Sequence, residues 1–165
     1  MAELSSKVAA EPWVAQASIS RQLPDTLTVH VEEHVPKAVI LDGGFFLVDA
    51  AGEPFKRLEE GERGTLPIIS GIDLSAGGPD LHEQRAKIDL GLDVLEQWTS
   101  KTRPQLSEVN VGPHRDLTLY TAESGTQLRF GRGDFGVRLE HYDGIRLALA
   151  GNAERLAVVH LDHSI

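Results

Sequence analysis

Three glycines in a GxGxxG pattern form the most specific chemical motif in the sequence. Gly131, Gly133 and Gly136 follow a predicted strand and open a predicted helix. In dinucleotide-binding proteins, main-chain N–H groups at such a turn hold a pyrophosphate at the helix N-terminus. Here Asp134 would place a carboxylate on the same donors, and only three residues follow Asp162. A nucleotide-binding βαβ fragment is therefore the alternative interpretation, and we favour a capped strand-to-helix turn.

Histidine pairs and neighbouring carboxylates are the other groups that could carry chemistry. His30 and His34 lie four apart on one predicted strand, and His160 and His163 lie three apart. A zinc or iron site needs three or four converging ligands, and residues three apart on a strand face opposite ways. Glu32-Glu33 point apart for the same reason, and the sequence has no GxSxG, P-loop or HExxH motif. We expect no catalytic residues, no metal site and no cofactor, and therefore no enzyme.

Composition describes a folded, acidic chain. The 165 residues are 41% hydrophobic and 25% charged, with 16 Lys and Arg against 25 Asp and Glu, a net charge of −9. That balance fits a globular chain and argues against nucleic-acid or polybasic membrane contacts. Cysteine is absent, which excludes disulfides, thiol nucleophiles and Cys-ligated zinc. No apolar run approaches the ~20 residues of a membrane helix.

The N-terminal quarter predicts a hairpin. Two extended runs, 17–23 and 26–33, flank Pro24-Asp25, a pair that favours a tight turn. In the second run apolar and polar residues alternate, which predicts a strand with one buried face made by Leu27, Val29 and Val31. Pro36 ends this strand.

Beyond Pro36 the pattern predicts a mostly antiparallel sheet with two helices, an α+β fold. Pro67 should confine the run 66–69 to an edge or irregular segment. We expect helices over 80–99 and 135–150, capped by Asp80 and Asp134. Strands are expected over 37–41, 45–49, 107–111, 116–122, 127–130 and 156–162.

The last predicted strand carries the interaction hypothesis. Residues 156–161 (LAVVHL) are apolar and β-prone, with no charge before Asp162. At the end of a sheet, such a strand can accept a strand from a partner, whereas inside a sheet it would be an ordinary buried strand. The candidate partner-binding residues are Val158, Val159, His160, Leu161, Asp162 and His163.

Several blocks in this order resemble the bacterial FtsQ/DivIB cell-division family. They are Leu-Pro-Asp-Thr-Leu at 23–27, Glu-x-x-Pro at 33–36, Val-Asp-Ala-Ala-Gly at 48–52, Leu-Pro-Ile-Ile-Ser-Gly at 66–71 and Gly-Arg-Gly-Asp at 131–134. Residues 159–163 (VHLDH) resemble the family's V-D-L-R-Y segment, departing from it at Asp162 and His163. A POTRA-bearing module of an outer-membrane assembly or secretion system would share only the hairpin.

The resemblance implies two domains, 1–36 as the C-terminal part of a POTRA domain and 37–165 as the β-domain. It implies a non-enzymatic divisome scaffold that recruits FtsB and FtsL through its last strands during septum formation. It places the chain on the periplasmic side of the cytoplasmic membrane, within a longer protein anchored by one membrane helix absent from this sequence. The uncovered hairpin edge also suggests a possible homodimer.

Overall fold

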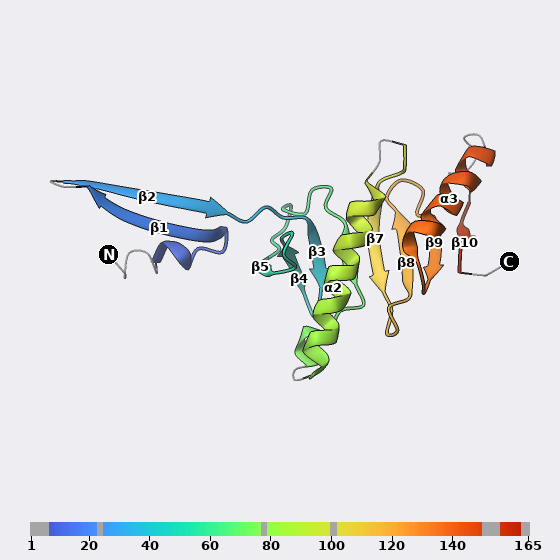
Figure 1. Ribbon diagram of the computed structural model, residues 1–165, viewed down its shortest axis with the longest axis horizontal. Coiled ribbons are helices and arrows are strands. Elements are labelled where there is room, and N and C mark those ends of the chain that lie inside the picture. Colours follow the sequence, from blue (N-terminus) through green and yellow to red (C-terminus); the bar gives the residue numbers. More distant parts are fainter. Residues whose placement is uncertain (1–6, 23–24, 77–78, 100–101, 150–155, 163–165) are drawn as a thin grey trace.

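Two sheets, one small and one large, make up most of the structure. The computed structural model describes residues 7–22, 25–76, 79–99, 102–149 and 156–162. A two-stranded hairpin extends away from an eight-stranded sheet, and both long helices lie on the near side of the large sheet in Figure 1. The expected α+β fold, with a leading hairpin, a sheet and two helices, is confirmed.

The hairpin consists of β1 (Val14–Gln22) and β2 (Thr26–Glu33), paired antiparallel. Its Pro24 lies outside the described residues. The prediction of a strand is confirmed, but the prediction that Leu27, Val29 and Val31 are buried is wrong. They are 46%, 46% and 41% exposed, because no described part of the chain packs over the face that carries them.

The eight-stranded sheet mixes both kinds of pairing. Its order is β10-β9-β8-β7-β6-β3-β4-β5, with parallel pairs at β10–β9, β7–β6 and β6–β3 and antiparallel pairs elsewhere. The strands are β3 (Ala38–Leu41), β4 (Phe45–Val48), β5 (Pro54–Arg57), β6 (Ile68–Ser70), β7 (Leu106–Val111), β8 (Leu117–Thr121), β9 (Gln127–Gly131) and β10 (Val158–His160). Strands β10 and β5 are therefore its two edges.

Strand β6 corrects the expectation drawn from Pro67. It lies in the middle of the sheet, parallel to β3 on one side and β7 on the other. Proline lacks only a donor, and here its carbonyl accepts from the Val39 N–H at 2.9 Å. The ladder on both sides then begins at Ile68, so no donor is missing where one is needed.

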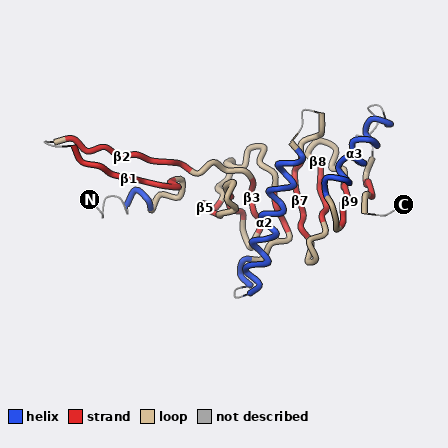
Figure 2. The backbone as a smooth tube through the Cα atoms, in the orientation of Figure 1, coloured by secondary structure: helices blue, strands red, loops and turns tan. Residues whose placement is uncertain are grey.

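One face of the sheet is covered by α2 (Pro79–Trp98) and α3 (Phe135–Leu149), with the 3₁₀ turn η1 (Leu74–Ala76) leading into α2. Figure 2 shows both long helices crossing the strands. A row of buried residues, one from each of six strands, meets them: Ile40, Ile69, Val109, Leu119, Leu128 and Val159.

Both helix predictions are confirmed to within a residue or two. Asp134 caps α3 as expected, because its Oδ1 accepts from the Val137 N–H at 3.1 Å. Asp80 is not the cap of α2, because the helix already begins at Pro79 and Asp80 lies in its first turn. Pro79 suits that first position, where no N–H is needed.

Candidate functional site

Strand β10 forms one end of the sheet, and its backbone orientation defines the candidate site. It pairs parallel with β9, and Val158 lies opposite Gln127. The Gln127 N–H donates to the Ala157 carbonyl at 2.9 Å, and the Leu161 N–H donates to the Arg129 carbonyl at 2.8 Å. Main-chain groups alternate in direction along a strand, so those of Val158 face away from β9. Among the described strands, none pairs with β10 on that side.

The side chains of the six candidate residues divide between core and surface. Val159 and Leu161 are each 8% exposed and belong to the core, whereas Val158 is 42% exposed. His160 is exposed, and its Nδ1 lies 3.5 Å from Oδ1 of the half-buried Asp162. His163 lies outside the described residues. The strand thus has its inward side chains held in the core while alternate positions face solvent.

Strand β10 is shorter than the predicted 156–162. The Leu156 carbonyl, two residues before the strand begins, accepts from the Thr126 hydroxyl at 2.7 Å. Thr126 is 4% exposed and belongs to a hydroxyl chain with Ser124 and Thr121, at 2.7 and 2.8 Å. Sequence reasoning missed these residues, because a Thr-x-x-Ser-x-Thr pattern around a turn gives no sign of which carbonyl it reaches.

The glycines of the GxGxxG pattern accommodate the protein's own side chains. Gly131 and Gly133 have φ of 62° and 117°, which glycine adopts readily. A Cβ on Gly131 would lie 2.6 Å from the Asp162 Cβ, and one on Gly133 would lie 3.3 Å from the Arg138 guanidinium. The Arg138 side chain also donates to the Phe130 carbonyl.

These contacts weigh against the nucleotide-binding interpretation, although β9, α3 and β10 do form a βαβ unit. A dinucleotide needs open main-chain donors at the helix N-terminus. In this chain the Asp134 carboxylate takes the Val137 donor, while Arg138 and Asp162 lie against the glycine turn. The turn is therefore a tightly packed connection between β9, α3 and β10.

The histidines of the predicted hairpin do not converge. His30 is 74% exposed and lies 4.0 Å from Glu32, whereas the His34 Nδ1 lies 2.8 Å from the Asp49 Oδ2. Within the described residues, no group of three or more His, Asp or Glu is placed to hold a metal ion. No helix among those residues is long and apolar enough to cross a bilayer.

Comparison with known proteins identifies the family of the chain. Residues 38–162 match the family described as "Cell division protein FtsQ/DivIB, C-terminal", and residues 1–34 match "POTRA domain, FtsQ-type". The chain belongs to the FtsQ/DivIB family. A match over the C-terminal region is not expected of a POTRA module from an unrelated assembly, so that alternative loses its support.

Named relatives agree with the family match. Over 92% of the chain, it is 36% identical to "Cell division protein FtsQ" of Anaeromyxobacter sp. (strain K), covering 52% of that protein. It is 31% identical to the FtsQ of Syntrophotalea carbinolica over 96% of the chain, covering 61% of that relative. With the Escherichia coli FtsQ, identity is 31% over 79% of the chain and 44% of the relative. The chain thus spans about half the length of the curated relatives it matches.

Proposed function

We propose that this chain is a non-enzymatic scaffold of the division machinery, which recruits FtsB and FtsL-like subunits through the β10 edge during septum formation. The observation that carries the proposal is the position of β10 at the end of the sheet, with the main-chain groups of Val158 directed outward. A strand in that position can extend the sheet by pairing with a segment of another protein.

The packing of β10 suits it to this role. Val159 and Leu161 are anchored in the core, so the backbone between them is held in an extended conformation before any partner arrives. A preorganised edge avoids part of the entropy cost of ordering a strand on binding. The alternate positions, Val158 and His160, are exposed and available to distinguish one partner strand from another.

A groove beside β10 offers a second point of contact. It has a volume of about 430 Å³ and lies between the C-terminal half of α3, the β8–β9 turn and the start of β10. Apolar lining comes from Tyr142, Ile145, Leu156 and Val159, and charged groups of both signs, Arg103, Arg146 and Glu123, also line the groove. In strand addition, backbone pairing supplies affinity and such pockets supply specificity. An apolar side chain is the partner feature that fits the apolar part of this groove.

Binding of the FtsB-like subunit's extracytoplasmic segment, measured by calorimetry, tests the proposal. Val158→Pro removes the outward donor and should weaken binding by about tenfold or more, the value of one lost hydrogen bond. Val158→Thr keeps the main-chain donor and the β-branched shape, so its Kd should stay within about threefold of the parent. Absence of binding by the parent, or equal Kd values for the proline and threonine variants, would refute the proposal.

Family membership supports two further proposals. We propose that the chain lies on the periplasmic side of the cytoplasmic membrane and that it belongs to a longer protein with a single membrane anchor. A full-length, epitope-tagged protein should be digested by protease added to spheroplasts and protected in intact cells. Protection in both would contradict this placement.

We also propose that the chain divides into domains 1–36 and 37–165. The separate hairpin and eight-stranded sheet on either side of Pro36 support this division. The hairpin's strands each have one partner among the described strands, which leaves an edge for a homodimer. Sedimentation equilibrium should then show a dimer in the parent chain and a monomer in an Ile19→Lys variant. A parent that stays monomeric would remove the dimer from the account.

A further inference from the structure

The hairpin meets the large sheet at a small cluster of side chains. The His34 ring stacks on Phe55 of β5, with ring centres 4.5 Å apart and planes 7° apart. Trp13 approaches the same Phe55 ring at 5.5 Å, and the Lys56 ammonium lies 5.5 Å from the centre of the Trp13 ring. Residues from before β1, after β2 and within β5 therefore pack together. We call this cluster of Trp13, His34, Phe55 and Lys56, with the neighbouring Asp49, the joint.

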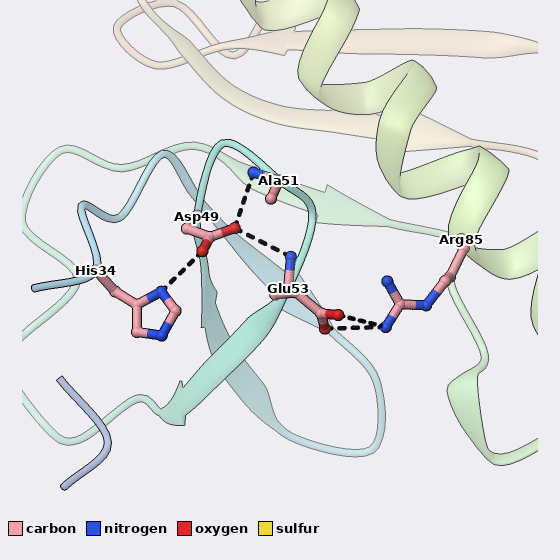
Figure 3. A network of polar contacts seen from close by, with 5 residues as sticks. All are labelled: His34, Asp49, Ala51, Glu53 and Arg85. Atoms are coloured by element: carbon pink, nitrogen blue, oxygen red, sulfur yellow. Dashed lines mark hydrogen bonds and ion pairs between the residues drawn. The ribbon is translucent and has the colours of Figure 1, made fainter. Parts of the chain in front are cut away.

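Asp49 is the polar centre of this joint, as Figure 3 shows. Its Oδ2 accepts from the His34 Nδ1 at 2.8 Å, and its Oδ1 accepts from the main-chain N–H groups of Ala51 and Glu53 at 2.9 and 3.1 Å. Burial raises the pKa of Asp49, but the hydrogen bonds from Glu53, His34 and Ala51 outweigh it and hold the pKa below its ordinary value. The side chains of His34 and Asp49 are 18% and 16% exposed, so solvent screens this pair only partly.

The same carboxylate shapes the turn that reaches α2. Both Glu53 carboxylate oxygens accept from Arg85 of α2 at 2.9 Å, on the path drawn in Figure 3. A Cβ on Gly52 would lie 3.1 Å from Asp89 and 3.4 Å from Ile88, so the turn also packs closely on the helix. One side chain, Asp49, thus connects the hairpin to a turn that is fixed on α2.

Little else in the connecting segment is positioned to fix the hairpin's direction. Between β2 and β3 the chain passes through Val35, which is 64% exposed, and Pro36. Backbone hydrogen bonds flank this segment, from His34 N–H to the Trp13 carbonyl and from Lys37 N–H to the Val48 carbonyl, at 2.9 and 2.8 Å. The first stays within the hairpin unit, so it does not orient that unit on the sheet.

We propose that the His34–Asp49 contact, closed over by the Phe55 stack, is a latch that sets the direction of the hairpin relative to the eight-stranded sheet. The hairpin is a long lever, since its 9-residue strand β1 extends about 30 Å at 3.3 Å per residue. A small rotation at the latch therefore moves its tip a long way. This inference is independent of the proposed partner at β10, which lies at the opposite end of the sheet.

A spin-label distance across the joint tests the latch directly. The chain contains no Cys, so Thr28→Cys on β2 and Glu140→Cys on α3, both exposed, give one labelled pair. With the latch intact, the distance distribution should be narrow. His34→Ala and Phe55→Leu, which affect the latch from opposite sides, should each broaden it at least twofold, with the sheet's thermal unfolding checked in parallel.

His30→Ala is the matched control, since His30 lies on β2, four residues before His34, and its side chain is 74% exposed. Its distribution should match the parent. A broad distribution in the parent would show that no latch exists. If His34→Ala or Phe55→Leu folds and still gives a narrow distance distribution, other contacts set the direction of the hairpin. That result would equally overturn the inference.

Discussion

At the scale of single residues, two glycines with nearly the same backbone angle have different surroundings. Gly131 has φ of 62°, and a Cβ added to it would lie 2.6 Å from the Asp162 Cβ. Gly125 has φ of 65°, and a Cβ added to it would have nothing within 4 Å. Gly125→Ala should therefore cost only the left-handed backbone penalty of about 1–2 kcal/mol. Gly131→Ala should cost about 1–3 kcal/mol more, because Asp162 must also move.

Urea denaturation of the two variants measures this difference in unfolding free energy. Equal losses would contradict the packed turn and reopen the glycine loop as a site for a ligand. A larger loss of stability in Gly131→Ala would support the close packing of this turn against Asp162, next to β10.

Asp143 on α3 makes the second residue-scale prediction. Its two oxygens accept from Arg103 at 3.0 and 2.7 Å, and Arg103 also donates to carbonyls at the end of α2. The hydrogen bonds from Arg103 hold the pKa of Asp143 below its ordinary value. The carboxylate is 35% exposed, so screening reduces its contribution, and Asp143→Asn should cost on the order of 1 kcal/mol at pH 7.

The sign of the pH dependence follows from the lowered pKa. A carboxyl group whose pKa is lower when folded stabilises the protein above its unfolded pKa of about 3.9, and that stability is lost as pH falls through the folded value. The stability difference between parent and Asp143→Asn should thus shrink as the pH falls below the unfolded pKa of about 3.9, as measured by chemical denaturation at several pH values. A stability gap that widens on acidification would contradict the assignment.

At the scale of elements, the closeness of α2 to the sheet depends on Gly91. A Cβ there would lie 2.8 Å from a methyl group of Ile69, which is fully buried in β6. Gly144 on α3 is the matched case, since nothing lies within 4 Å of its Cβ position. Alanine favours a helix by about 1 kcal/mol over glycine, so Gly144→Ala should stabilise the protein by up to that amount. Gly91→Ala should lose the gain and, by overpacking, destabilise by about 1 kcal/mol or more.

Thermal unfolding of both glycine variants measures the contrast. A rise in Tm for both would mean that α2 sits less tightly on β6 than the contact at Gly91 indicates.

Some elements could be predicted from the sequence better than others. The helices were predictable, because periodicity and capping are local properties. The strand β2 was predictable too, but its exposure was not, since burial depends on what packs over Leu27 and Val29. The position of β6 in the sheet was mispredicted from Pro67. The N–H that proline lacks is not needed there, because the Pro67 carbonyl accepts a hydrogen bond from β3 and the strand begins one residue later. At the candidate site, the family resemblance indicated the last strands, whereas the hydrogen bond between the Leu156 carbonyl and the Thr126 hydroxyl, 30 residues away in the chain, has no local sequence signal.

At the scale of the whole molecule, the two edges of the large sheet differ. Strand β5 begins at Pro54, and its Phe55 and Lys56 are engaged with Trp13 and His34 at the joint. Strand β10 has an exposed Val158 and no described strand on its outer side. A partner strand should therefore choose β10, and the far end of the sheet should be free to carry the hairpin.

Amide hydrogen exchange, read residue by residue by NMR with and without the FtsB-like segment, tests this central claim most directly. The Leu161 amide, already bonded to the Arg129 carbonyl, should be protected in both states. The Val158 amide should exchange quickly in the free chain and slow by at least tenfold in the complex. Slowed exchange confined to β5 or to the hairpin, with the Val158 amide unchanged, would contradict the account.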